Sequence, residues 1–146
     1  FIYELGANLQ CGDKILLGVD LIKSRDVVLP AYNDAQGITR EFNLNLLDRI
    51  NRELGADFDR ATFEHLPFYE ASEGIAKSYL VSKTDQEVHI GEHCFHFSAG
   101  ETIHTEISRK YNDQVLQTIL QNTDFTIETK ILDSQALFAD YVLRRN

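Results

Sequence analysis

Several residue types are scarce in this sequence of 146 residues, which has two prolines, eight glycines, two cysteines, and no methionine or tryptophan. So little proline and glycine excludes a collagen-like or low-complexity chain. No apolar run of about 18 residues occurs, and no basic segment followed by an apolar one opens the chain. We therefore expect neither a membrane span nor a signal peptide. Because translation starts at Met, a chain that begins at Phe1 is expected to be trimmed, or to be a piece of a longer protein.

Basic residues are also few, since 14 Lys and Arg stand against 23 Asp and Glu, a net charge of −9. Nucleic acids and anionic membranes are bound by clustered Lys and Arg, so we expect no nucleic acid and no membrane as a partner. Cys11 and Cys94 are too few for a disulfide framework. Reduced thiols in a cytoplasmic protein are the simplest interpretation, with Cys94 buried as a small apolar residue.

The residues that are present indicate an α/β protein. An amphipathic helix over 1–9 and a glycine turn lead into the nearly continuous apolar run 14–21. Such a run is typical of a strand buried on both faces of a parallel sheet. A helical region follows, with Pro30 in the first turn of one helix. A longer helix is predicted to begin around residues 37–39 and to run through Leu54, with Gly55 as the residue that ends it.

From Ser78 the hydrophobic period changes to two, which predicts half-buried antiparallel strands as far as Ser108. Asn112 or Asp113 can cap one more helix, and strands are predicted over 125–132 and 137–143. The two ends of the chain therefore resemble a buried α/β sheet. The middle resembles an insertion of helices and antiparallel strands.

The histidines raise the question of a metal site. Their spacing matches no common zinc motif. His93 and His96 would point to opposite faces of one strand, and Gly91 lies between His89 and His93. We therefore predict no metal site and interpret the histidines as satisfied or exposed strand residues. A glycine-rich phosphate loop and a nucleophile elbow are absent from the sequence as well.

The segment 101–111 combines an extended pattern with many polar side chains. Glu106 and Ser108 are two residues apart, so on a strand they face the same side, where a carboxylate and a hydroxyl could bind an imidazole or an ammonium group. An exposed, charge-protected edge strand is the alternative. Thr39 and Phe42 are three apart on the predicted helix, so they share a face that either lines a pocket or packs in the core.

Five long stretches, spread in order over nearly the whole chain, carry a family resemblance. They are LLGVDLIKS (16–24), AYNDAQGITREFNLNLLDRINRELGADFD (31–59), FEHLPFY (63–69), ETIHTEISRKY (101–111) and LFADYVL (137–143). Together they resemble the S-adenosylmethionine-dependent L-histidine Nα-methyltransferases of ergothioneine biosynthesis. In that family a Rossmann-like methyltransferase domain is interrupted by a substrate-binding domain.

The resemblance implies the fold of the C-terminal part of such an enzyme. Residues 1–25 would end a helix and form the fifth strand of the methyltransferase sheet. Residues 26–109 would be an inserted α+β substrate-binding domain. Residues 110–146 would return to the methyltransferase domain with a helix and its last two strands.

The resemblance also implies which residues bind the substrate. The imidazole-binding Glu and Ser of the family fall on Glu106 and Ser108, and the Thr and Phe of its pocket helix fall on Thr39 and Phe42. Ser78 stands where many members carry a Met as a pocket wall. No catalytic residue is assigned, because methyl transfer to the α-amino nitrogen of histidine depends mostly on positioning and on exclusion of water.

The loop that would bind the co-substrate S-adenosylmethionine has no counterpart in the sequence, so its binding residues are unknown and the chain alone is expected to be inactive. Incomplete sheets expose edges, so we expect pairing with a missing N-terminal half or a homodimer. Two other functions stay open. One is methylation of a different amino acid, and the other is a non-catalytic module that binds an amino acid.

Overall fold

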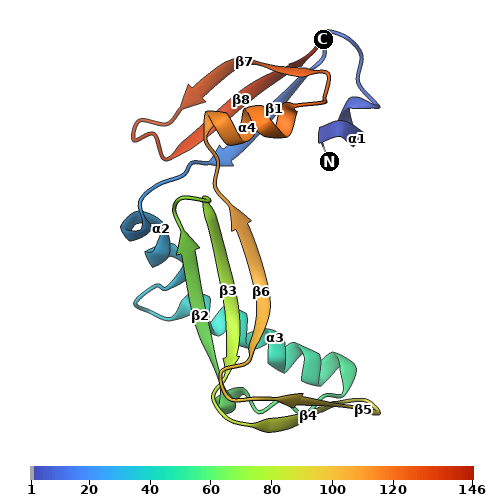
Figure 1. Cartoon of the computed structure of the whole chain (residues 1–146), viewed down its shortest axis with the longest axis vertical. Coiled ribbons are helices and arrows are strands. Elements are labelled where there is room, and N and C mark those ends of the chain that lie inside the picture. The colour runs from blue at the N-terminus through green and yellow to red at the C-terminus, as the bar shows by residue number, and fades with distance from the viewer. Residues whose placement is uncertain (1) are drawn as a thin grey trace. The chain divides into compact units, whose positions relative to one another are not determined.

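The computed structural model describes residues 2–146, and Phe1 lies outside the described residues. The chain divides into two compact units, whose helices and strands are labelled in Figure 1. Unit 1 comprises Phe1–Lys23 and Arg109–Asn146, and unit 2 comprises Ser24–Ser108. Both units combine helices with antiparallel strands, so the fold is mixed α/β. The assignment of two units to a methyltransferase domain and a substrate-binding domain stays a prediction.

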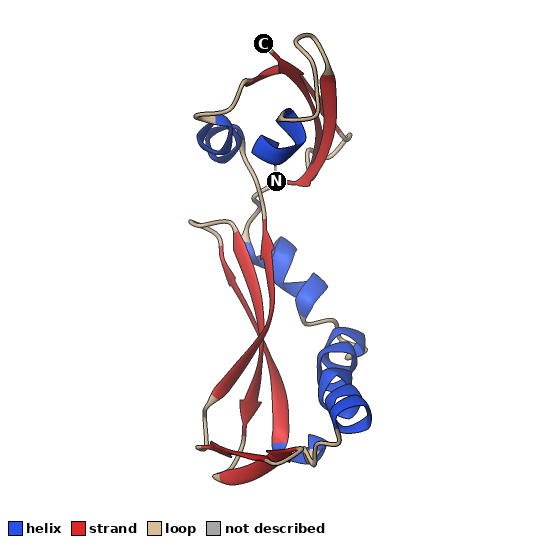
Figure 2. Cartoon of the chain, turned by 90° about the vertical axis from the view of Figure 1, so that its right-hand side faces the viewer, coloured by secondary structure: helices blue, strands red, loops and turns tan. Residues whose placement is uncertain are grey.

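Unit 1 is a three-stranded antiparallel sheet with two helices. Its elements are α1 (Ile2–Gly6), β1 (Lys14–Asp20), α4 (Asp113–Leu120), β7 (Phe125–Leu132) and β8 (Phe138–Arg145). The strand order is β1-β8-β7, and β8 runs antiparallel to both neighbours. Figure 2 shows α1 and α4 on the same side of this sheet. Leu116 of α4 and Tyr141 and Leu143 of β8 are fully buried there.

The expected burial of β1 on both faces is wrong for this structure. Ile15, Leu17 and Val19 contact the core of unit 1, whereas Leu16, on the opposite face, is 69% exposed. The strand also pairs with β8 and not within a parallel sheet. Only one face of this apolar strand is therefore covered, because both helices of unit 1 lie on one side of the sheet.

Unit 2 contains a three-stranded sheet, a two-stranded hairpin and helices. Its elements are α2 (Arg25–Tyr32), α3 (Ile38–Leu54), the 3-10 helix η1 (Arg60–Thr62), β2 (Phe63–Glu70), β3 (Ile75–Ser82), β4 (Gln86–Ile90), β5 (His93–Phe97) and β6 (Thr102–Arg109). The larger sheet has the order β2-β3-β6, and β4 pairs with β5. The helices α2 and α3 lie along one face of the larger sheet (Figure 2). Leu47 of α3 and Leu80 of β3 meet in the core between them, and both are fully buried.

The bounds of α3 confirm the predicted helix. Gly37 precedes it with a φ of 72°, and Gly55 follows it with a φ of 65°, both in the left-handed region that glycine adopts without strain. The prediction for Pro30 is wrong, because Pro30 lies inside α2, well beyond its first turn. Pro30 cannot donate a backbone hydrogen bond there, so it weakens this short helix. No helix among residues 2–146 is long and apolar enough to cross a membrane.

Candidate active site

The strand β6 lies at one edge of its sheet and carries two of the predicted side chains. Glu106 and Ser108 are both half-buried, although Ile107 between them is 61% exposed. Their separation places both on one face of the strand. The strand is thus an edge strand, as the alternative interpretation expected, but these two side chains are not simply solvated.

The first turns of α3 carry the other predicted pair. Thr39 is half-buried, and its hydroxyl lies 3.3 Å from the carbonyl oxygen of Ala31, to which it donates a hydrogen bond. Phe42 is 75% exposed. The interpretation of Phe42 as a core residue is therefore wrong, and a large aromatic ring is left on the surface of the helix.

An open cavity of about 280 Å³ lies between α3 and β6. Its walls come from one helix and one strand: Phe42, Asn43, Asn45, Leu46, Arg49, Thr105 and Glu106. The structure thus brings Phe42 and Glu106 to one cavity, although they are far apart in the sequence. Thr39, Ser78 and Ser108 are not part of its walls. An aromatic ring, amide groups and a carboxylate can together hold a flat, polar ring such as an imidazole.

A chain of hydrogen bonds links α3, β6 and β3 beside the cavity. The Asn43 amide donates to the carbonyl of Thr39 at 3.0 Å. The Thr105 hydroxyl lies 2.7 Å from Asn43 Oδ1 and 3.0 Å from the carbonyl oxygen of Ser78, and its proton is shared between these acceptors. Asn43 is 4% exposed, so the network is shielded from water and fixes the helix against the edge strand.

Two buried side-chain atoms have no hydrogen-bond partner among the described residues, namely His65 Nε2 and Ser78 Oγ. In the register of β2 and β3, His65 opposes Leu80 and Ser78 opposes Pro67. The two polar side chains are therefore diagonal neighbours on one face of the sheet. Buried polar atoms in proteins are nearly always paired, so these two are available to a ligand or to ordered water.

The environment of His65 favours its neutral form. Burial lowers the pKa of the His65 imidazole below its usual range, while the negative charge of Glu106 acts in the opposite direction and the positive charge of Arg40 adds to the lowering. A neutral imidazole has one nitrogen that donates and one that accepts. His65 can therefore pair with either kind of polar group.

Three polar residues of unit 2 are not identified by the sequence patterns: Asn43 and Thr105, which line the cavity, and His65, which does not. The sequence does hold a signal for Asn43, because it precedes the core residue Leu47 by four positions and the partly buried Ile50 by seven, and so lies on the apolar stripe of α3. A polar residue on such a stripe needs a buried partner. Nothing in the local sequence identifies Thr105 as that partner.

Unit 1 holds a separate charged cluster at the end of β1. Asp20 pairs with Lys23 and, at 3.0 Å, with Lys110, which is 6% exposed. Partial burial raises the pKa of Asp20, but hydrogen bonds from the two ammonium groups outweigh this effect, so its pKa lies below the usual range. The carboxylate of Asp20 pairs with both ammonium groups, which is typical of a structural ion-pair cluster.

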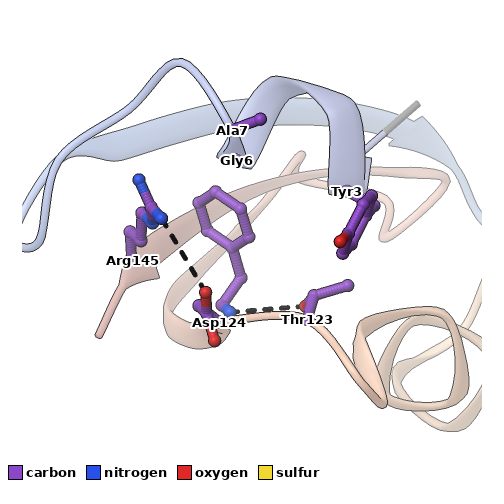
Figure 3. Close-up of a pocket in the computed structure, with 7 residues that line it drawn as sticks. Tyr3, Gly6, Ala7, Thr123, Asp124 and Arg145 are labelled. Carbon is purple, nitrogen blue, oxygen red and sulfur yellow. Dashed lines mark hydrogen bonds and ion pairs between the residues drawn. The ribbon is translucent and has the colours of Figure 1, made fainter.

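Unit 1 also has a small cavity of about 110 Å³ beneath α1, drawn in Figure 3. Asp124 and Arg145 on its wall approach each other to 3.8 Å, and the Thr123 hydroxyl accepts a hydrogen bond from the amide of Phe125 (Figure 3). The charged groups of this cavity therefore pair with each other, and the Thr123 hydroxyl bonds to the backbone. It is a weaker candidate than the cavity in unit 2.

Mixed α/β architecture with antiparallel sheets is consistent with a methyltransferase domain. Comparison with known families identifies the class of methyltransferase. A family model described as histidine-specific methyltransferase, SAM-dependent, matches residues 1–145. The chain therefore belongs to this family. Membership covers essentially the whole sequence, so both units lie within the matched region.

The match to each relative covers only part of that relative's length. Histidine N-alpha-methyltransferase of Mycolicibacterium smegmatis is 40% identical over 116 residues, which is 78% of this chain and 36% of that protein. The protein of the same name from Mycobacterium tuberculosis is 37% identical over 118 residues, 80% of this chain and 37% of that protein. Ergothioneine biosynthesis protein 1 of Schizosaccharomyces pombe is 28% identical over 146 residues, 99% of this chain and 19% of that protein. The chain thus spans about a third of the length of the mycobacterial relatives and a smaller share of the length of the yeast relative.

Proposed function

We propose that this chain supplies the amino acid-binding part of an enzyme that transfers methyl groups from S-adenosylmethionine to the α-amino nitrogen of L-histidine. The observation that carries the proposal is the cavity between α3 and β6, which the ring of Phe42 and the carboxylate of Glu106 both line. Family membership and the names of the mycobacterial relatives support histidine as the substrate.

In this proposal Glu106 and Ser108 hold the imidazole of the substrate. A neutral imidazole presents one N–H donor and one bare nitrogen, and the carboxylate accepts from the first while the hydroxyl donates to the second. Phe42 packs against the ring and covers it from water. Thr39 contributes indirectly, because its backbone carbonyl oxygen accepts a hydrogen bond from the Asn43 side chain at 3.0 Å. Asn43 in turn bonds to Thr105, which keeps the helix in position beside β6.

Ser78 is the fifth residue of the proposed site, although it does not line the cavity. Its carbonyl oxygen accepts from Thr105, which neighbours Glu106 on β6. Its own buried hydroxyl lacks a partner among the described residues and can bind a water or a polar group of the substrate. This hydroxyl makes the interior of unit 2 at this position more polar than a larger apolar residue would.

The methyl donor makes other demands, which we propose are met by residues outside unit 1. A glycine-rich turn directly after a strand would be needed, but Gly12 precedes β1 and Gly18 lies within it. When bound, S-adenosylmethionine supplies a sulfonium methyl group to the amine. We expect residues outside these 146 to bind it, and the chain alone to be inactive.

The proposed domain is the end of a Rossmann-like sheet with unit 2 inserted into it. In support, β1 and β7 both run antiparallel to β8, so they are parallel to each other. Unit 2 (Ser24–Ser108) follows β1 in the sequence and ends within β6, and the chain then returns to unit 1 through α4. The resemblance implies the same path.

Histidine binding by variants of Glu106 tests the proposal. The protein translated from the full reading frame that contains this sequence is titrated with L-histidine and, separately, with S-adenosylmethionine. Removing one charged partner of a buried hydrogen bond costs about 1.5–3 kcal/mol, or roughly 10- to 150-fold in affinity. We expect Glu106→Gln to lose this factor for histidine and to leave the affinity for S-adenosylmethionine unchanged.

Glu64→Gln is the matched control, because Glu64 is an exposed carboxylate of β2 that does not line the cavity. It should bind histidine as the parent protein does. Equal histidine affinity for Glu106→Gln and the parent would reject the assignment of Glu106.

A second candidate function is methylation of a different amino acid, and the small, polar Ser78 at a buried position is the observation in its favour. Titration of the same protein with tryptophan separates the two candidates. Tighter binding of tryptophan than of histidine would support the second. Binding of histidine without any binding of S-adenosylmethionine would instead support a non-catalytic amino acid-binding module.

A further inference from the structure

The β4–β5 hairpin of unit 2 gathers metal-binding residue types that lie outside the proposed substrate site. In its register Glu87 opposes His96, and His89 opposes Cys94. Side chains alternate along each strand, so these four project from one face of the hairpin. Val88, on the other face, is 1% exposed and belongs to the core of unit 2. The four residues are all exposed.

Cys94 is therefore not the buried apolar residue that the sequence predicts. Spacing along a single strand did not indicate a metal site because the grouping arises between two strands. Gly91, with a φ of 57°, lies in the turn that folds β5 back onto β4. This turn brings Cys94 opposite His89 instead of separating them.

The ligand atoms on this face are already close together. One donor atom from each of Glu87, His89 and Cys94 lies within 4.8 Å of the other two. His96 Nδ1 lies 3.3 Å from Glu87 Oε1, so a second imidazole adjoins the group. Donor atoms bound to one tetrahedral zinc ion are roughly 3.3–3.7 Å apart. Small side-chain rotations of exposed residues are enough to reach that separation.

His89 is held in an orientation suited to binding a cation. Its ring Nδ1 lies 3.0 Å from Asp57 Oδ2, and its backbone amide donates to Asp57 Oδ1 at 2.6 Å. The segment before β4 is tied to the hairpin by a bridge between Ala56 and Ile90. With Nδ1 engaged by a carboxylate, Nε2 is left for a cation. This is the arrangement found around metal-bound histidines in many proteins.

We propose that this face of the hairpin binds Zn²⁺ through Glu87, His89 and Cys94, with His96 or water as the fourth ligand and Asp57 orienting His89. A thiolate, an imidazole and a carboxylate together favour zinc over Mg²⁺ or Ca²⁺, which prefer oxygen ligands only. On binding, the Cys94 thiol releases its proton to solvent. The ion would tie the two strands of the hairpin together.

Titration of the metal-free chain with Co²⁺ tests the site, because a thiolate bound to Co²⁺ gives an intense near-ultraviolet charge-transfer band. The chain has only two cysteines, so each can be removed in turn. We expect the band in the parent chain and in Cys11→Ser, and its loss in Cys94→Ser. Added Zn²⁺ should abolish the band by displacing Co²⁺.

Two histidine variants provide the matched comparison. His89→Gln should weaken Co²⁺ binding at least about tenfold, because the loss of even an outer-shell partner of a metal ligand typically costs about 10- to 100-fold in affinity. His93→Gln should not change it, because His93 opposes Ile90 and shares the face of Val88. Circular dichroism of every variant establishes that the fold is intact, and a metal-dependent rise in the thermal midpoint of the parent gives a second measure of binding.

No band in the folded parent chain would overturn the proposal, as would a band that persists in Cys94→Ser or disappears in Cys11→Ser. Equal weakening by His89→Gln and His93→Gln would also reject the ligand set. The titration involves neither histidine nor S-adenosylmethionine. Its outcome is therefore independent of the proposed methyltransferase function.

Discussion

At the residue scale, Asp34 shows how one side chain starts a helix that the candidate site depends on. Its carboxylate accepts the backbone amides of Ile38 and Thr39, each at 2.8 Å, in the first turn of α3. Gly37, at the N-cap position, has no side chain that could do this. These hydrogen bonds, that from Thr39 first, lower the pKa of Asp34 to about 2.

The stability of the chain should therefore depend on the charge of Asp34. A lowered folded-state pKa means that the contribution is fully present above the unfolded pKa and is lost as pH falls from 3.8 to about 2. We predict that Asp34→Ala lowers the urea midpoint near neutral pH. The difference between parent and variant should shrink over that acidic interval. A difference that stays constant through the interval would contradict the role given to the carboxylate.

The features that could be predicted at this scale are those decided by neighbouring residues. The helical spacing of Leu44 and Leu47 and the position of Gly55 are local signals. The helix predicted from them is confirmed as α3. The Asn112 cap of α4 is confirmed too, since its side chain accepts the amide of Val115. Asn43 could not be interpreted from its neighbours, because its partner Thr105 is 62 positions away.

Predictions that depend on the pairing of distant strands were less successful. Burial of Cys94 is wrong because the register of the hairpin decides which face it occupies. Burial of β1 on both faces is wrong because the elements that cover a strand are set by tertiary structure, not by its own composition. For the candidate site, spacing alone left the roles of Glu106 and Phe42 open. The family resemblance selected them, and the structure shows that they line one cavity.

At the element scale, α3 is attached to its sheet through one buried stripe. Leu47 is fully buried in the core of unit 2, whereas Leu54, on the same helix, is 60% exposed. We predict that Leu47→Ala lowers the free energy of unfolding by about 2–5 kcal/mol, the usual cost of such a cavity. Leu54→Ala should change it by less than about 0.5 kcal/mol.

Urea unfolding followed by circular dichroism measures both variants. The helical propensities of the substitutions are identical, so the comparison isolates burial. Equal effects of Leu47→Ala and Leu54→Ala would show that α3 does not rest on the sheet through Leu47. The wall of the cavity formed by Phe42 and Asn43 would then lack its support.

At the scale of the whole molecule, the described residues 2–146 form separate cores that have no residue in common. Leu116 belongs to the core of unit 1 and Leu47 to that of unit 2. Unit 1 joins the two ends of the sequence, because β1 pairs with β8, while unit 2 uses a single continuous stretch. Each core therefore stabilises its own sheet, and cooperative opening is expected to follow these units.

Amide hydrogen exchange read by mass spectrometry can test this division. We predict that Leu116→Ala, at a fully buried position, reduces protection in β1, β7 and β8 and leaves α3, β2 and β3 unchanged. Leu47→Ala should have the reverse effect, because its cavity lies in the other core. If either variant reduced protection equally in both units, the two cores would form one cooperative structure. Loss of protection confined to the unit that carries the substitution would mean that the proposed substrate site in unit 2 can be altered while the sheet of unit 1 stays folded.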